Sequence, residues 1–144
     1  MVNIGAKAVT RRVAVAEAIV SAPPAVMKHF RGGDIRSRKG PVFQTAILAG
    51  VMAAKNTSHL IPLCHPIGLD DCNIEIVVRH KNRMVITCRC EVHHKTGVEM
   101  EALTGATVAA LTIYDMCKAL SRKIVIQHVR LVQKTGGKHD FKAG

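Results

Sequence analysis

Alternating apolar and polar residues mark four extended segments of the chain. In segments 12–20, 72–80, 84–94 and 123–132, apolar side chains recur at about every second position. This is the pattern of a β-strand with one buried face. Residues 81–83, which link the second and third segments, are short and polar, so we expect these two strands to form a β-hairpin.

Three helices are predicted between these strands. Proline residues open the segments 25–30 and 41–55, a position that favours the start of a helix. The longest predicted helix covers 98–120, and Thr96 and Glu99 have the spacing of a capping box at its beginning.

The order strand, two helices, two strands, helix, strand fits an α+β fold. We predict a ferredoxin-like antiparallel sheet with the helices packed on one face. Segments 34–39 and 60–66 are expected to be connections, the first charged and the second bounded by proline. No repeat, low-complexity stretch or linker divides the chain, and we therefore predict a single domain over residues 1–144.

The two sides of the longest predicted helix differ in character. At 100° per residue, one side is an apolar stripe that should face the core: Leu103, Ala106, Ala110, Ile113, Cys117 and Leu120. The opposite side mixes apolar and chargeable residues: Glu101, Thr104, Val108, Leu111, Thr112, Asp115 and Lys118. Such a mixture predicts a partly buried surface, which could be a subunit interface, a pocket or both.

Three side chains of this helix are candidates for chemistry. Asp115 and Lys118 are neighbours on one side of the helix. They could form an ordinary ion pair, or a lysine whose pKa is lowered toward neutrality could transfer protons there. The Glu101 carboxylate could accept the paired N–H donors of a guanine or pterin edge.

Composition and charge narrow the class of protein. Hydrophobic residues make up 48% and charged residues 22%, as in folded globular proteins. There is no apolar run long enough to cross a bilayer and no secretory signal near the start, so we expect a cytoplasmic protein without membrane association. The net charge of +11 indicates an anionic partner such as phosphate, nucleic acid or a membrane surface.

Cysteine and histidine residues do not form a recognisable metal motif. None of the five cysteines has the two-residue spacing of a zinc site, so no metal is predicted. Cys88 and Cys90 share one face of a strand and are interpreted as buried structural thiols, with a metal or redox role left as the alternative. A Cys64–His65 dyad is disfavoured because neighbours in an extended chain point in opposite directions; His65 is better suited to contact a phosphate or base.

Three longer segments resemble one known family. They are LIPLCHP at 60–66, KTGVEMEALT at 95–104 and AALTIYDMCKA at 109–119. They resemble the cyclic pyranopterin monophosphate synthases, the MoaC-type accessory proteins of molybdenum-cofactor biosynthesis. The resemblance implies a lyase that converts a cyclised dihydroguanosine triphosphate into cyclic pyranopterin monophosphate and releases pyrophosphate. It also implies a ferredoxin-like subunit, a homohexamer built as a trimer of dimers, and a functional link to the radical GTP cyclase that makes the substrate.

The resemblance also assigns roles to individual residues. It implies three catalytic residues, Asp115, Lys118 and Lys39. It implies substrate binding by Leu63, Cys64, His65, Met100 and Glu101, with Arg12, Lys134 and Lys138 in the same pocket or at the phosphates. No cofactor is required, although the triphosphate could carry Mg²⁺. One departure from the family pattern is Asn3, where an aspartate is usual.

Two alternatives to this enzyme remain. A ferredoxin-like RNA-binding module would explain the charge, but it should carry aromatic residues on its central strands, and the chain has three Phe, one Tyr and no Trp. A scaffold that only hands on the intermediate would keep the pocket but tolerate loss of Lys118. Glu101 and Lys118 should lie about 26 Å apart along one helix, which favours an enzyme site shared across an interface.

Overall fold

The computed structural model describes residues 1–144, and its main element is a five-stranded antiparallel sheet with the order β5-β6-β1-β7-β8. The strands are β1 (Thr10–Ser21), β5 (Asp71–Arg79), β6 (Arg83–His94), β7 (Val125–Thr135) and β8 (Phe141–Lys142). The predicted hairpin is confirmed as β5–β6. The register pairs Cys72 with Cys90 and Ile74 with Cys88 across it.

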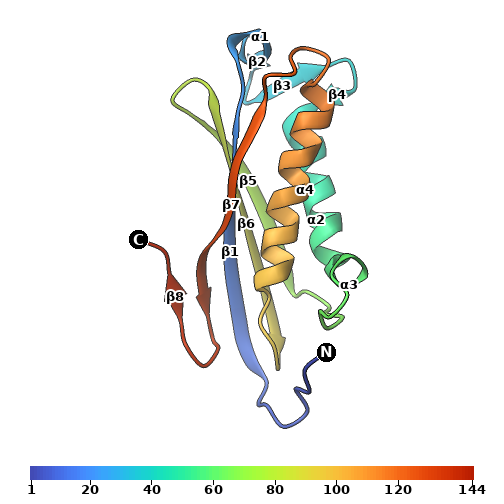
Figure 1. The fold of residues 1–144 in the computed structure, drawn as a ribbon, viewed down its shortest axis with the longest axis vertical. Helices are drawn as coiled ribbons and strands as arrows, with labels where there is room; N and C mark the ends of the chain where they lie inside the picture. The colour runs from blue at the N-terminus through green and yellow to red at the C-terminus, as the bar shows by residue number, and fades with distance from the viewer.

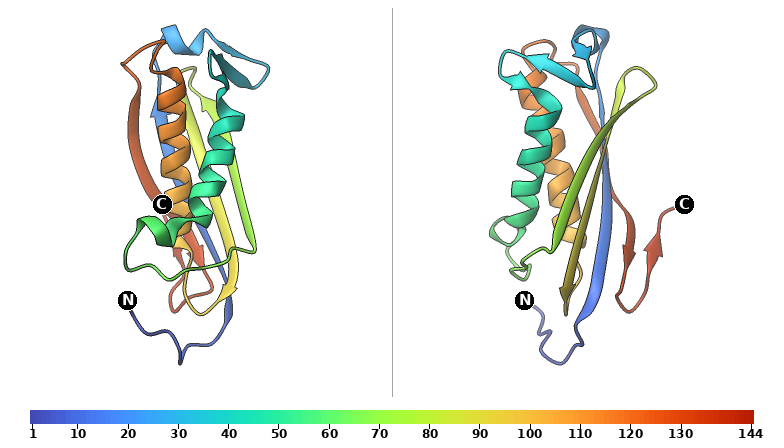
Figure 2. Two further views of the ribbon diagram at one scale, coloured as in Figure 1. Left: turned by 90° about the vertical axis from the view of Figure 1, so that its right-hand side faces the viewer. Right: turned by 180° about the vertical axis from the view of Figure 1, so that it is seen from behind.

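Two helices cover one face of this sheet, as Figures 1 and 2 show. They are α2 (Val42–Lys55) and α4 (Glu99–Cys117), and they lie side by side. The shorter elements are α1 (Pro24–Met27), β2 (Phe30–Arg31), β3 (Asp34–Ser37), β4 (Gly40–Pro41) and α3 (Thr57–Leu60). This arrangement confirms the predicted α+β, ferredoxin-like fold with its helices on one face.

Small residues allow the helices to lie close to the sheet and to each other. On the helix-facing side of β1, every second residue is fully buried: Ala14, Ala16, Ala18 and Val20. A Cβ atom added at Gly50 of α2 would lie 2.8 Å from the carbonyl oxygen of Gly105 in α4. Because real Cβ atoms do not approach a backbone oxygen so closely, larger residues would push the two helices apart.

The predicted faces of α4 agree with the structure in part. Ala106, Ala110, Ile113 and Cys117 of the apolar stripe are fully buried, as expected. On the opposite side, Glu101 is only 3% exposed, whereas Leu111 is 52% exposed. The mixed face is therefore buried near the beginning of the helix and open farther along it.

Two predicted element boundaries were wrong for identifiable reasons. The helix predicted over 25–30 ends at Met27, and the supposed loop 34–39 contains β3. The buried Asp34 carboxylate explains the second error, because it accepts the backbone N–H groups of Ile35 and Phe43 at 2.6 and 2.7 Å. By doing so, Asp34 also stabilises the beginning of α2.

The predicted capping box at the start of α4 was also wrong. The helix begins at Glu99, and the residue before it, Val98, makes no side-chain cap. The Glu99 carboxylate instead forms an ion pair with Lys134 of β7 at 3.1 Å. At the other end, α4 stops at Cys117, three residues earlier than predicted. No helix in the structure is both long and apolar enough to span a membrane.

Candidate active site

One group of predicted catalytic residues lies at the C-terminal end of α4. The Lys39 Nζ atom lies 2.5 Å from Oδ2 of Asp115, and the Lys118 Nζ atom lies 2.8 Å from Oδ1. Lys39 comes from the turn between β3 and β4, which Figure 1 shows beside this end of α4. The fold thus joins all three predicted catalytic residues, although Lys39 is 76 positions from Asp115.

The electrostatics of this group follow from its two ion pairs. Hydrogen bonds from Lys118 and Lys39 lower the pKa of Asp115 to about 2. The same contact with Asp115 raises the pKa of Lys118. Of the two possibilities left open by the sequence, these contacts agree with the ordinary ion pair and not with a lowered lysine pKa, because all three side chains are about half exposed and desolvation is weak there. In the single chain, the contact with Asp115 therefore favours the cationic form of Lys118.

A second group of predicted residues lies near the beginning of α4. A pocket of about 400 Å³ is lined by Leu63, Cys64, His65, Met100 and Glu101, all five predicted to bind substrate. Burial raises the pKa of Glu101, and the nearby Glu99 raises it further. Burial likewise raises the pKa of the Cys64 thiol. The His65 Nε2 atom lies 2.8 Å from the Val2 carbonyl oxygen, an arrangement that orients the imidazole.

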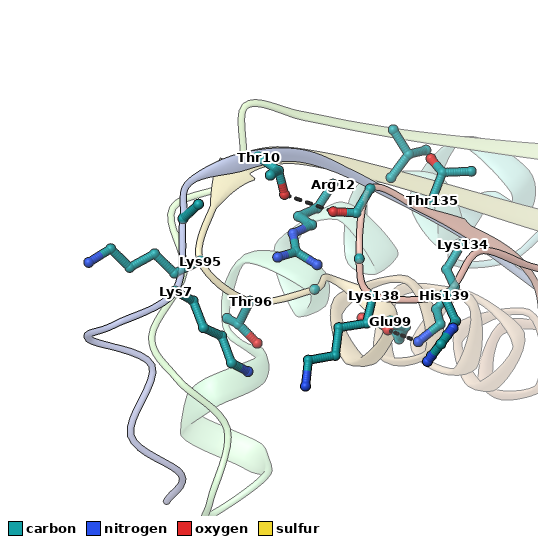
Figure 3. Close-up of a pocket in the computed structure, with 15 residues that line it drawn as sticks. Lys7, Thr10, Arg12, Lys95, Thr96, Glu99, Lys134, Thr135, Lys138 and His139 are labelled. Carbon is teal, nitrogen blue, oxygen red and sulfur yellow. Dashed lines mark hydrogen bonds and ion pairs between the residues drawn. The ribbon is translucent and has the colours of Figure 1, made fainter.

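A strongly basic pocket adjoins this one. It has a volume of about 510 Å³ and includes Arg12, predicted to belong to the substrate pocket, and Lys134 and Lys138, predicted to reach the phosphates. Figure 3 shows Arg12, Lys138 and Lys7 directed toward the same space from three different segments. Glu99 lines both pockets, so the eight predicted binding residues surround one continuous hollow.

Arg12 lines this pocket and lacks a hydrogen-bond acceptor within the chain. Its Nε atom is the one buried side-chain nitrogen or oxygen without a hydrogen-bond partner. A buried N–H group left unpaired costs about 1–3 kcal/mol. An anionic ligand in the pocket would supply the missing acceptor and would pair with the guanidinium charge.

Several residues of the hollow were missed by sequence reasoning. They are Lys7, Lys95, Thr96 and His139, which line the basic pocket. Their signal in the sequence was weak, because lysines in exposed segments are common and the pocket is assembled only when β1, β7 and the start of α4 meet. Gly136 is needed for this assembly: its φ is +85°, and a Cβ there would collide with the Arg11 carbonyl oxygen.

The two groups of predicted residues do not meet within one chain. Glu101 lies in the first turn of α4, and Lys118 follows the last residue of the helix. Seventeen residues of continuous helix correspond to about 26 Å. The structure confirms the separation predicted from the sequence, and a ligand of nucleotide size cannot contact both groups of one chain.

Three thiols form a separate cluster on the helix-facing side of the sheet. The sulfur atoms of Cys72, Cys88 and Cys90 all lie within 4.8 Å of one another. Sequence spacing did not reveal this cluster, because Cys72 comes from the neighbouring strand. Hydrogen bonding from Cys88 and Cys90 lowers the pKa of Cys72. Hydrogen bonds with Cys72 and Cys88 raise the pKa of Cys90.

The fold and the hollow together define a class of protein: a ferredoxin-like α+β protein with a basic pocket whose charge is complementary to an anion. The model of the MoaC family matches residues 1–137, and the chain belongs to this family. It is 51% identical over 143 residues to the cyclic pyranopterin monophosphate synthase of Xanthomonas oryzae, covering 99% of this chain and 87% of that protein.

Two larger relatives contain a region similar to this chain. The molybdenum cofactor biosynthesis bifunctional protein of Synechocystis is 47% identical over 144 residues, which are 97% of this chain and 42% of that protein. The molybdenum cofactor biosynthesis protein 1 of Dictyostelium discoideum is 47% identical over 154 residues, which are 96% of this chain and 24% of that protein. In both relatives, the matching region is therefore joined to a further length of chain.

Proposed function

We propose that the chain is a cyclic pyranopterin monophosphate synthase of molybdenum-cofactor biosynthesis. It converts a cyclised dihydroguanosine triphosphate into cyclic pyranopterin monophosphate and pyrophosphate. The observation that carries this proposal is the 51% identity to a synthase of that name across 99% of the chain. The hollow supports it independently, because its lining fits the two chemically different halves of such a substrate.

In this proposal, the base-derived half of the substrate lies against Glu101 and His65. Both line the smaller pocket, where Glu101 is nearly buried. An ionised carboxylate can accept two N–H donors from a guanine or pterin edge. Such bonds gain strength in a site shielded from water, and they offset the cost of keeping Glu101 charged there.

The triphosphate occupies the basic pocket in the same proposal. Arg12, Lys134 and Lys138 supply cations, and Gly136 and Gly137 allow close approach of the backbone. A sugar hydroxyl attacks the α-phosphorus, the bond to the β-phosphate breaks, and pyrophosphate leaves. The cations stabilise the charge that gathers on the leaving group. Mg²⁺ could accompany the phosphates, and no protein-bound cofactor is proposed.

Lys39, Asp115 and Lys118 carry the proton transfers of ring opening and ring rebuilding. In the single chain, Lys118 is a proton donor held by Asp115. Exclusion of water by substrate and a second subunit would lower its pKa, so that it could also accept a proton. Asp115 remains ionised throughout and positions both lysines.

We further propose that each active site combines two subunits of a homohexamer arranged as a trimer of dimers. The two groups of functional residues lie about 26 Å apart in one chain, too far for one substrate. Leu111, one turn before Asp115 on the same helix face, is 52% exposed. On α2, Leu48 and Met52 are also exposed, at 61% and 57%. Exposed apolar side chains on both helices support burial against another copy.

The first test is turnover by the purified full-length protein. With the cyclised nucleotide supplied under anaerobic conditions, we expect pyrophosphate and cyclic pyranopterin monophosphate in equal amounts. Binding of the nucleotide without product would favour the scaffold alternative. RNA binding that weakens with salt, with no thermal protection by guanine triphosphates, would favour the nucleic-acid alternative.

Mixing two impaired variants, assayed at a substrate concentration far below the raised KM of Glu101→Gln so that neither is active alone, tests the shared site. Lys118→Ala removes the catalytic end of α4, and Glu101→Gln removes the binding end. If each site takes one end from each of two chains, random mixing restores about a quarter of the wild-type activity, because half of the dimers contain one intact site. Mixtures that stay as inactive as the separate variants, despite demonstrated subunit exchange, would contradict the shared site.

Two further parts of the proposal concern the cellular setting. We propose a cytoplasmic enzyme that receives its substrate from a radical GTP cyclase. The bifunctional relative of Synechocystis, in which a matching region forms 42% of a longer protein, supports the close association of this activity with another step. Co-purification with the cyclase, or faster coupled turnover when both are present, would test this link.

A further inference from the structure

The thiol cluster of Cys72, Cys88 and Cys90 has the geometry of a metal site. The Cys88 and Cys90 sulfurs are 3.9 Å apart, and the Cys90 and Cys72 sulfurs are 3.8 Å apart. A cation with metal–sulfur bonds of about 2.3 Å, placed at the centre of three sulfurs, would hold them about 4.0 Å apart. Two of the three sulfur pairs already have this spacing, and the third pair, Cys72 and Cys88, lies within 4.8 Å, so coordination requires only small side-chain adjustments.

The backbone keeps these sulfurs in place. The antiparallel register sets Cys72 directly opposite Cys90, and Cys88 lies two residues before Cys90 on the same face of β6. On the helix side, a Cβ added at Gly105 of α4 would lie 2.7 Å from the Cys88 sulfur. Only glycine leaves space for this sulfur, so the cluster is fixed by the sheet and α4 together.

The cluster also has a route to solvent. Cys88 and Cys90 are fully buried, but Cys72 is only half-buried and lines a pocket of about 400 Å³. Lys55, Asp70 and Asp71 line the same pocket, and the two carboxylates are paired with His93 and Arg89, so the entrance is polar and of mixed charge. Three sulfurs serving only as small apolar core residues would need no such opening.

The donor set indicates which cation the site would take. All three donors are sulfur, and no carboxylate or imidazole belongs to the group. Thiolate ligands favour soft cations, Cu⁺ above all. Zinc in structural sites almost always has four ligands, whereas Cu⁺ accepts three. We propose that Cys72, Cys88 and Cys90 form a three-coordinate site for Cu⁺, separate from the active site.

Copper titration of the reduced full-length protein tests the site. Cu⁺ is added without oxygen in competition with bicinchoninate, and thiolate-to-copper absorption follows its binding. We expect one Cu⁺ per chain, three sulfur neighbours at about 2.3 Å by X-ray absorption, and a rise in Tm. No uptake against the competitor, two sulfur neighbours, or displacement of Cu⁺ by equimolar Zn²⁺ would overturn the proposal.

Matched serine variants locate the site. Cys72→Ser changes a half-buried cluster residue, and Cys64→Ser changes a half-buried thiol outside it. Cys72→Ser should weaken Cu⁺ binding more than about 100-fold, since even changes that leave the ligands in place cost up to that much. Cys64→Ser should bind Cu⁺ as the wild type does. Equal weakening in both variants, each folded by circular dichroism, would overturn the assignment.

An oxidised pair is the main competing explanation. If air oxidation links Cys72 to Cys90 in a disulfide and the reduced protein takes up no Cu⁺, the cluster is a thiol pair and the metal site is overturned. Peptide mass mapping of alkylated protein distinguishes the two results. This test is independent of turnover, so its outcome does not depend on the proposed synthase function.

Discussion

The two ends of α4 carry the residues proposed to bind substrate and to catalyse the reaction, and their surroundings are opposite. At the beginning of the helix, Glu101 is 3% exposed and Arg12 has a buried, unpaired N–H. At the far end, Lys39, Asp115 and Lys118 are paired with one another and about half exposed. The proposed binding end is therefore already buried in the single chain, whereas the proposed catalytic end is still exposed to water.

This difference shows what each end gains from association. A buried carboxylate and an unpaired guanidinium N–H are ready for a ligand, because their desolvation cost has been met by folding. The exposed ion pair of Asp115 and Lys118 is weakened by water and salt. The pKa of Lys118 nevertheless remains raised by this contact. Only burial at an interface would give the catalytic end the dielectric environment that acid–base chemistry needs.

The largest expected effect follows from removing the lysines of the catalytic end. Lys118→Ala and Lys39→Ala should each lower kcat about a thousandfold, the range typical of a lost general acid or base, with little change in substrate affinity. Lys123→Ala, another exposed lysine close to the end of α4, is the charge-matched control. Product formation near the wild-type rate in both variants, with assembly intact, would remove these lysines from the mechanism.

A smaller effect is expected when the carboxylate between the lysines is neutralised. Asp115→Asn should reduce kcat about a hundredfold and should lower the pKa of Lys118, because the contact that raises it is lost. If Lys118 donates a proton, the alkaline limb of the pH profile of kcat moves to lower pH. An unchanged limb would show that another group limits the rate at high pH.

The binding end should respond through affinity. Glu101→Gln keeps the size of the side chain but loses the charge, and a hydrogen bond to a charged group contributes about 1.5–3 kcal/mol. KM should therefore rise about 10- to 100-fold, with a smaller change in kcat. The exposed Glu75→Gln, on β5, is the control. If only kcat fell and KM did not change, Glu101 would act in catalysis and not in substrate binding.

The smallest effect is expected on the pH dependence of thermal stability, again in Glu101→Gln. Burial raises the pKa of Glu101 above its unfolded value of 4.5, so the native state binds more protons than the unfolded state. The free energy of unfolding therefore falls as the pH rises from 4.5 through the raised pKa. Glu101→Gln should therefore have the higher Tm at neutral pH. The advantage should disappear as pH falls to 4.5, and thermal melts at several pH values measure it.

The fold was largely predictable from the sequence because it depends on local patterns. Alternation located four strands, and the stripe from Ala106 to Cys117 identified the core side of α4. Errors arose where a distant residue decides the local structure. Asp34 stabilises the beginning of α2 although it lies nine residues before Phe43, whose N–H it accepts. The Glu99 carboxylate, which was predicted to belong to a capping box, forms an ion pair with Lys134 instead.

The candidate site was predictable to a different degree. Asp115 and Lys118 are helix neighbours and could be paired from spacing, but Lys39 entered only through the family resemblance. Lys7 and Lys95 were missed because nothing in their local sequence distinguishes them from other exposed lysines. The thiol cluster escaped notice because it depends on strand register, which places Cys72 opposite Cys90.

Because α4 is a continuous helix, it fixes both the distance and the relative orientation of the side chains at its two ends. Each residue adds 1.5 Å and turns the helix by about 100°. A single-residue insertion in its middle would leave Glu101 in place but rotate Asp115 and Lys118 away from their partner Lys39. Four inserted residues would nearly restore the angle while lengthening the helix by about 6 Å. Changes of length within α4 would therefore disrupt function even where every functional side chain is retained.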